Sequence, residues 1–246
     1  MSGPSNPAAS STPVDAPDVH RPEERAALSP ARFWLLMSGI IMLVLVLISF
    51  YGRFLDRTLP KPKLPVLAAP YGDLAVTERS GRTVHLDDLR GKVVVLACIY
   101  TVCPHGCAAV VGEMQKLHRE FGSCSDFHLV SLAVAPERDT PAFLSSYAEG
   151  IGVKAGDPWW FVTGGQKAVW SFMTDALKLD APKPIPENER LNPLDFYSHD
   201  LRIVLVDRAG RLRGYYAVFH PQPEIAMLMA QRLHRDVRTL LDDPDH

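Results

Sequence analysis

The sequence has few cysteines, no excess of charge of either sign and no internal repeat. Four cysteines in 246 residues are too few for a disulfide-based scaffold. The 26 Lys and Arg residues nearly balance the 28 Asp and Glu residues, so the composition gives no sign of a nucleic-acid-binding surface. The chain is long enough for one well-buried domain together with additional segments.

One long apolar run, Phe33 to Gly52, contains no charged residue. A helix of that length spans about 30 Å, which is the thickness of the hydrocarbon core of a bilayer. Trp34 and Tyr51 lie near its ends, where aromatic side chains favour the membrane interface. The run is apolar on nearly all faces and no Ala-x-Ala cleavage site follows it. We therefore predict a single transmembrane helix over residues 33–52.

The segments on either side of this helix differ in composition from a folded domain. Residues 1–32 are rich in Pro, Ser, Ala and Asp, which predicts a disordered tail. Residues 53–70 contain four prolines, typical of a stiff, extended tether, and residues 242–246 form a short C-terminal tail. Basic residues flank both ends of the apolar run, so counting charges does not determine its orientation.

Residues 71–241 have the pattern of an α/β domain. The apolar runs Val93 to Tyr100 and Phe127 to Ala135 predict buried strands, and the residues between them have helical spacing, which predicts a right-handed βαβ unit with parallel strands. Further elements are predicted as helices over 140–147, 166–177 and 225–241, a strand over 159–162, a proline-rich long loop over 180–198, and a hairpin of 201–206 with 212–218. A βαβ unit followed by a C-terminal β-hairpin and helix is the order of a thioredoxin-like domain.

The most distinctive motif is Thr101-Val102-Cys103-Pro104-His105-Gly106-Cys107-Ala108, where the first predicted strand leads into a helix. Proline favours the first helical position, so we expect Pro104 to begin the helix and Cys103 to be its N-cap. Residues four apart on a helix are neighbours, so the two sulfurs would lie close enough to form a disulfide or to bind one soft metal ion. A helix N-terminus also favours thiolates.

Five sequence blocks, taken with their spacing, resemble the Sco/SenC family of copper chaperones used in cytochrome c oxidase assembly. They are Leu89-Arg90-Gly91-Lys92-Val93-Val94-Val95, the Cys-x-x-x-Cys of the motif, Pro136-Glu137-Arg138-Asp139-Thr140-Pro141, Val162-Thr163-Gly164, and Ser198-His199. The resemblance covers roughly Ala68 to Leu241, and the N-terminal anchor and tether are also similar to this family. It implies a thioredoxin-like domain that faces the periplasm or intermembrane space and has the CuA-bearing subunit of cytochrome c oxidase as its partner.

The resemblance also implies a copper site formed by Cys103, Cys107 and His199. Two thiolates and an imidazole suit Cu(I), and the imidazole also tolerates Cu(II). A structural zinc site would need a fourth ligand, and none is evident. The expected activity is that of a metallochaperone rather than an enzyme, on a single-pass protein of the cytoplasmic membrane with its soluble domain in the periplasm.

Three residues depart from the usual pattern of the family. Ala135 stands where Asp is usual, Ala108 where Pro is common, and His105 where an acidic residue is frequent. None of these changes removes an implied ligand, but the change at Ala135 bears on partner recognition or on the charge near the site. We expect His105 to be a surface residue, and we expect Cys98, inside a predicted strand, to be an inert buried residue.

Two other functions fit the same residues. The first is thiol–disulfide exchange, with Cys103 as the attacking thiol and Cys107 as the resolving thiol, to reduce the cysteines of a copper-receiving protein. Enzymes of this kind commonly use Cys-x-x-Cys, so the additional residue in this motif favours metal binding. The second is a redox or copper sensor.

Overall fold

The computed structural model describes residues 29–58 and 63–243. Much of the predicted N-terminal tail (1–28), the middle of the tether (59–62) and most of the C-terminal tail (244–246) lie outside the described residues. The chain divides into two compact units, residues 1–60 and 61–246. We describe each of them separately.

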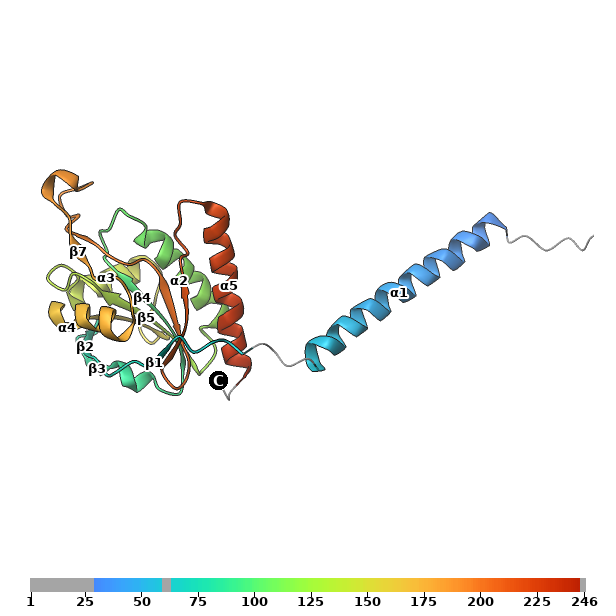
Figure 1. The fold of residues 1–246 in the computed structure, drawn as a ribbon, viewed down its shortest axis with the longest axis horizontal. Helices are drawn as coiled ribbons and strands as arrows, with labels where there is room; N and C mark the ends of the chain where they lie inside the picture. Colours follow the sequence, from blue (N-terminus) through green and yellow to red (C-terminus); the bar gives the residue numbers. More distant parts are fainter. Residues whose placement is uncertain (1–28, 59–62, 244–246) are drawn as a thin grey trace, which may run out of the picture. The chain divides into compact units, whose positions relative to one another are not determined.

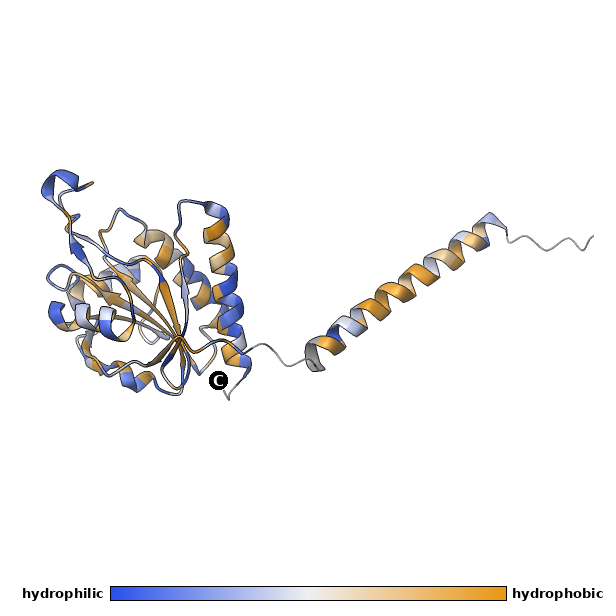
Figure 2. Ribbon diagram, viewed as in Figure 1, coloured by the Kyte–Doolittle hydropathy of each residue, from blue (hydrophilic) through white to orange (hydrophobic). Residues whose placement is uncertain are grey.

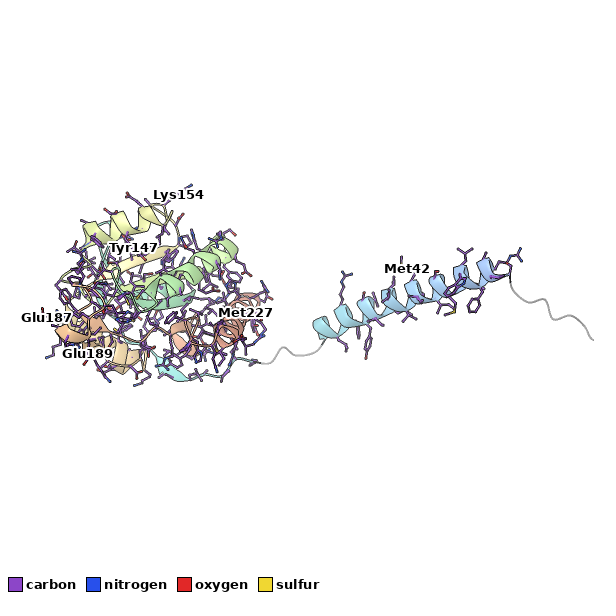
Figure 3. All side chains as sticks on the ribbon, turned by 90° about the horizontal axis from the view of Figure 1, so that it is seen from above. Met42, Tyr147, Lys154, Glu187, Glu189 and Met227 are labelled. Atoms are coloured by element: carbon purple, nitrogen blue, oxygen red, sulfur yellow. The ribbon has the colours of Figure 1, made fainter. Side chains whose placement is uncertain are left out.

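The first unit contains the helix α1 (Pro30–Thr58). Its stretch Pro30–Leu55 is long and apolar enough to cross a membrane, and its apolar side chains are exposed. Figure 2 shows that the middle turns are apolar, and Met42 projects outward from these turns (Figure 3). Helix α1 is therefore a candidate transmembrane anchor.

The second unit is built on an eight-stranded sheet with the order β1-β10-β9-β4-β5-β6-β2-β3. Its strands are β1 (Ala68–Pro70), β2 (Ala75–Glu78), β3 (Thr83–His85), β4 (Val93–Ile99), β5 (Phe127–Ala133), β6 (Trp159–Thr163), β9 (Ile203–Val206) and β10 (Arg211–Tyr216). Strands β4, β5 and β6 run parallel, whereas β9 is antiparallel to β4. Every residue of β4 and β5 is buried, as expected for parallel strands covered on both faces. The predicted βαβ unit is confirmed.

Helices cover both faces of this sheet (Figure 1). They are η1 (Leu86–Leu89), α2 (Cys107–Phe121), α3 (Pro141–Gly150), α4 (Gln166–Ser171), its π-helical continuation η2 (Phe172–Ala176), and α5 (Pro223–Asp242). One hydrophobic core joins α2, α3 and α5 to the sheet, and a second core joins α4, η1 and η2 to the opposite face. Successive side chains of β4 alternate between the two cores, and Cys98 points into the second one.

Two predicted local features are confirmed in this unit. Helix α3 begins with Pro141 at its first position, and the Thr140 hydroxyl oxygen accepts a hydrogen bond from the Phe143 backbone N–H at 3.4 Å. Cys98 is almost completely buried, and burial raises the pKa of its thiol far above the ordinary value. Cys98 is therefore unreactive in the folded domain.

The segment over residues 180–198 is more ordered than the predicted long loop. Strands β7 (Lys183–Pro184) and β8 (Tyr197–Ser198) pair in an antiparallel ribbon, with the short 3₁₀-helix η3 (Glu187–Glu189) between them. Glu187 and Glu189 lie at the outer edge of the domain (Figure 3). The return strand of this ribbon leads directly to His199 and then to β9.

Candidate metal centre

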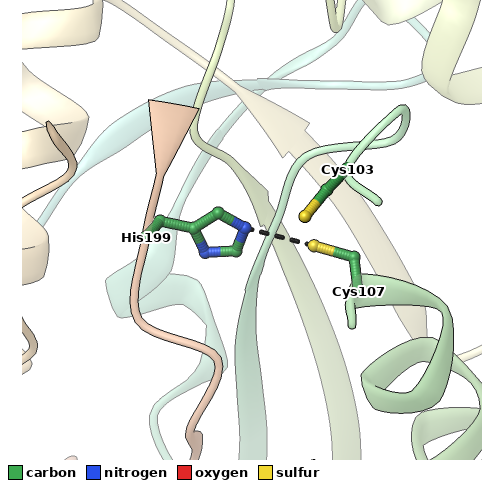
Figure 4. Close-up of side chains that lie close together, drawn as sticks. All are labelled: Cys103, Cys107 and His199. Atoms are coloured by element: carbon green, nitrogen blue, oxygen red, sulfur yellow. Dashed lines mark hydrogen bonds between the residues drawn. The ribbon is translucent and has the colours of Figure 1, made fainter. Parts of the chain in front are cut away.

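Two cysteines and one histidine meet beyond the carboxyl end of β4. The ligand atoms of Cys103, Cys107 and His199 all lie within 4.8 Å of one another. The Cys107 Sγ is 3.1 Å from the His199 Nε2, although the two residues are 92 positions apart in the sequence (Figure 4). Because β4 and β9 are antiparallel neighbours, the chain leaving β4 and the chain entering β9 meet at the same edge of the sheet.

The local geometry of the cysteine motif differs from the predicted one. Helix α2 begins at Cys107, and Gly106 is its N-cap with φ +129°. Glycine adopts this conformation readily because it has no Cβ. The Cys103 backbone N–H donates to the Tyr100 carbonyl oxygen at 2.9 Å, so Cys103 lies in a turn before the helix. The prediction that Cys103 is the N-cap and Pro104 the first helical residue is wrong, because the conformation of Gly106 interrupts the helical path between the two cysteines.

The two sulfurs differ in exposure and in charge. Cys107 is buried and Cys103 is partly exposed. The hydrogen bond from the Cys107 thiol, which outweighs burial, lowers the pKa of Cys103 to about 4, and the nearby His199 ring and the hydrogen bond from the His105 backbone N–H act in the same direction. That same hydrogen bond, reinforced by burial, raises the pKa of Cys107. Cys103 is thus the thiolate of the pair, and the shared proton resides on Cys107.

The His199 ring is oriented by its main-chain neighbour. Its Nδ1 lies 2.9 Å from the Asp200 carbonyl oxygen. A carbonyl only accepts hydrogen bonds, so Nδ1 carries the hydrogen, and in the neutral imidazole Nε2 presents its lone pair towards Cys107. Metal-binding histidines commonly have this arrangement, in which the nitrogen that does not bind the metal donates to a carbonyl or carboxylate.

Buried apolar side chains pack beneath the two cysteines, and a buried carboxylate binds the residue that begins the cysteine motif. Ala135 and Tyr100 are completely buried and pack with Cys107 in a small cluster. Next to it, the fully buried Asp139 accepts hydrogen bonds from the hydroxyl and, at 3.3 Å, the backbone N–H of Thr101. Burial, only partly offset by these bonds, raises the pKa of Asp139 to about 6. Asp139 therefore fixes the start of the cysteine motif.

His105 is partly exposed, and its ring also contacts a buried carboxylate that was not predicted. Its Nε2 lies 2.8 and 2.9 Å from the two carboxylate oxygens of Asp195, which is completely buried. Sequence reasoning missed this pair because Asp195 is 90 positions away, in a proline-rich segment whose path was not predictable. A lone aspartate in a predicted loop gives no signal that it will be buried.

The donor set matches a soft metal ion. Within residues 29–58 and 63–243, this is the only group of three or more His, Cys, Asp or Glu side chains whose geometry suits a metal ion. Two sulfurs and one imidazole nitrogen form a three-coordinate set that favours Cu(I). With three ligands, the group does not make the closed tetrahedral site of structural zinc.

Known proteins with the same architecture were found by sequence and by structure. The SCO1 protein homolog of Bacillus subtilis (strain 168) is 28% identical over 121 residues, which are 48% of this chain and 62% of that protein. The match therefore spans less than two thirds of that relative. The structure of BsSco, described as a member of the Sco family of cytochrome c oxidase assembly proteins with a disulfide switch, has a TM-score of 0.58 at 21% identity and covers 74% of this chain and 99% of that one.

The structure of Bradyrhizobium japonicum ScoI with copper bound is similar as well, with a TM-score of 0.52 at 23% identity, over 66% of this chain and 99% of that one. These likenesses show that the second unit has the thioredoxin-like fold of Sco proteins. The SCO1/SenC family model matches residues 68–234, which is more than half of the sequence. The chain therefore belongs to the SCO1/SenC family.

Proposed function

We propose that this protein is a membrane-anchored copper chaperone that delivers copper, bound by Cys103, Cys107 and His199, to the CuA centre of cytochrome c oxidase. The observation that carries the proposal is the convergence of two sulfurs and one imidazole nitrogen within 4.8 Å. Membership of the SCO1/SenC family supports copper as the cargo, since the related Bradyrhizobium japonicum ScoI binds copper. The description of BsSco as a member of a family of oxidase assembly proteins supports the choice of partner.

The unequal exposure of the sulfurs suits a carrier that must release its metal. Cys103 is partly exposed and is already a thiolate, so it is the ligand that a thiolate or imidazole of a partner replaces first. Cys107 is buried and holds the shared proton, so metal binding displaces that proton and depends on pH. Transfer then proceeds by stepwise ligand exchange without a free copper ion.

The same proposal assigns roles to the remaining segments. Helix α1 anchors the protein in the cytoplasmic membrane, the part of residues 53–70 between α1 and β1 is the tether, and the domain built on the eight-stranded sheet is the copper-binding domain on the periplasmic side. The support for an anchor is the apolar stretch Pro30–Leu55, which is long enough to cross a bilayer. The support for the periplasmic side is the link between Sco proteins and oxidase assembly.

Copper stoichiometry of the full-length protein in detergent micelles tests this proposal. The wild type should retain one copper per chain, with sulfur and nitrogen ligation in its X-ray absorption spectrum. Cys103→Ala/Cys107→Ala should retain none, and His199→Ala should lose the nitrogen contribution. Cys98→Ala is the matched control, because this thiol is buried on the other face of β4 and should not affect loading. Equal copper in the wild type and the double cysteine variant would refute the proposal.

A second function is favoured by the electrostatics of the sulfur pair. A partly exposed thiolate next to a buried, protonated thiol is the arrangement of an attacking and a resolving cysteine. In this alternative the protein reduces the cysteines of a copper-receiving protein. His199→Ala separates the two functions, because thiol–disulfide exchange should survive the substitution and copper transfer should not.

A further inference from the structure

Two contacts that involve no metal ligand join the cysteine motif and the residue before it to the segment that carries His199. The His105 ring lies against the Asp195 carboxylate, at 2.8 and 2.9 Å from its two oxygens. The Tyr100 hydroxyl donates to the carbonyl oxygen of Leu194, the residue before Asp195. Both contacts therefore reach the segment just before strand β8, which leads to His199.

The carboxylate in this contact is enclosed by protein. Asp195 has no exposed surface, whereas the His105 side chain is 36% exposed. The Leu191 backbone N–H donates to one Asp195 oxygen at 3.0 Å, and His105 provides the side-chain donor. A buried carboxylate that loses one of its two donors is left partly unsatisfied at a desolvation cost, so the paired arrangement is favoured over separated loops.

His105 connects this carboxylate to the thiolate through its own main chain. Its backbone N–H donates to the Cys103 Sγ at 3.3 Å, while its ring contacts Asp195. The next residue, Gly106, lies under the Phe219 ring, which limits movement on the other side. His105 thus contacts both the Cys103 sulfur and the segment that carries His199.

We propose that His105 and Asp195 form a clamp that sets the distance between Cys103 and His199 before copper arrives, so that both are positioning residues of the copper site. The expected effect of the clamp on copper affinity rests on the proposed function. Without the clamp, the two ligand-bearing loops would have to be ordered when the metal binds, at the expense of affinity. If one additional side chain has to be ordered when copper binds, the copper affinity falls about tenfold.

The first measurement does not use copper. Hydrogen exchange of the copper-free, full-length protein should become faster in residues 101–106 and in residues 190–199 together when His105 is replaced by Ala. His105→Gln retains an N–H donor for Asp195 and should keep the exchange of the wild type. His85→Ala is the matched control, because His85 also pairs with an aspartate, Asp73 at 2.5 Å, but on an exposed strand edge. Unchanged exchange in residues 190–199 of His105→Ala would overturn the clamp.

The second measurement is competition with a Cu(I) chelator. The affinity should fall about tenfold in His105→Ala and return to the wild-type value in His105→Gln. His105→Ala/Asp195→Ala leaves no unpaired buried carboxylate, so it separates loss of the clamp from misfolding and should show the same tenfold loss. Wild-type affinity in this double variant would also overturn the clamp. If the wild type itself binds no copper, the proposed function fails, while hydrogen exchange still decides the clamp.

Discussion

Replacing Gly106 with Ala should damage both the stability of the domain and its copper site. Gly106 lies between the two cysteines with φ +129°, a conformation that residues with a side chain rarely adopt. A Cβ at this position would lie 2.5 Å from the Phe219 Cδ1 and 2.7 Å from two other atoms of the same ring. The substitution thus brings a backbone cost and a steric cost.

The backbone cost should be the larger of the two. Holding a residue with a side chain in such a conformation costs about 1–3 kcal/mol. The Phe219 ring is 46% exposed, so it can swing away from the new methyl group. Swinging out forfeits roughly half of the 1.5–3 kcal/mol that full burial of a phenylalanine contributes, or about 1 kcal/mol. We therefore expect Gly106→Ala to lower the free energy of unfolding by about 2–4 kcal/mol.

A double-mutant cycle, measured by denaturant unfolding with tryptophan fluorescence, separates these costs. In the Phe219→Ala background, Gly106→Ala should cost about 1 kcal/mol less than in the wild type, because no ring has to move. Gly112→Ala is the control: Gly112 is inside α2 with open space around it, so alanine should stabilise the helix by about 0.5–1 kcal/mol. A Gly106→Ala variant that is as stable as the wild type and loads copper equally well would refute this reasoning.

Three further predictions concern reactivity, pH and packing. In the reduced protein, the rate of alkylation of Cys103 should fall to half its maximum near pH 4, while Cys107 should react far more slowly, as measured by peptide mass spectrometry. The hydrogen bond with Glu113 raises the pKa of His234 above 6.5 and lowers that of Glu113 below 4.5. The stabilisation by this pair should be complete between about pH 4.5 and 6.5, and should be lost as pH rises through the raised histidine value or falls through the lowered glutamate value. The difference in denaturant midpoint between the wild type and His234→Gln should therefore be largest in that window. Met114→Ala, at a fully buried position of α2, should lower the free energy of unfolding by about 2–5 kcal/mol in urea titrations, without changing the copper stoichiometry.

The central part of the fold was predictable because its signals are local. Strands β4 and β5 are continuous apolar runs, and the helix between them has apolar residues at helical spacing. The β7–β8 ribbon was not predictable, since each strand has two residues and exists only through pairing between Pro184 and Tyr197 or their neighbours. Such short strands have no periodicity of their own.

The candidate site, like the fold, was predictable only in part from the sequence. The spacing of Cys103 and Cys107 indicated sulfur chemistry, whereas His199 was identified only through the resemblance to a family. The predicted helix start was wrong because Gly106 adopts a conformation that interrupts the helix, despite the preference of Pro104 for the first helical position. Gly106 lies against the ring of Phe219, which comes from a distant loop. The partner of His105 could not be inferred, because pairing across 90 residues depends on the complete fold.

The alternation of side chains along β4 also determines what an oxidant can do to this protein. Cys98 points into the core on one face of the sheet, Cys124 packs at the margin of the core on the other face, and the motif sulfurs stand together beyond the strand end. Among these four cysteines, all within the described residues, Cys103 and Cys107 are the pair that the fold holds together. Oxidation of the folded chain should thus yield a single intramolecular product, free of shuffled isomers, and returning it to the dithiol form should require no unfolding.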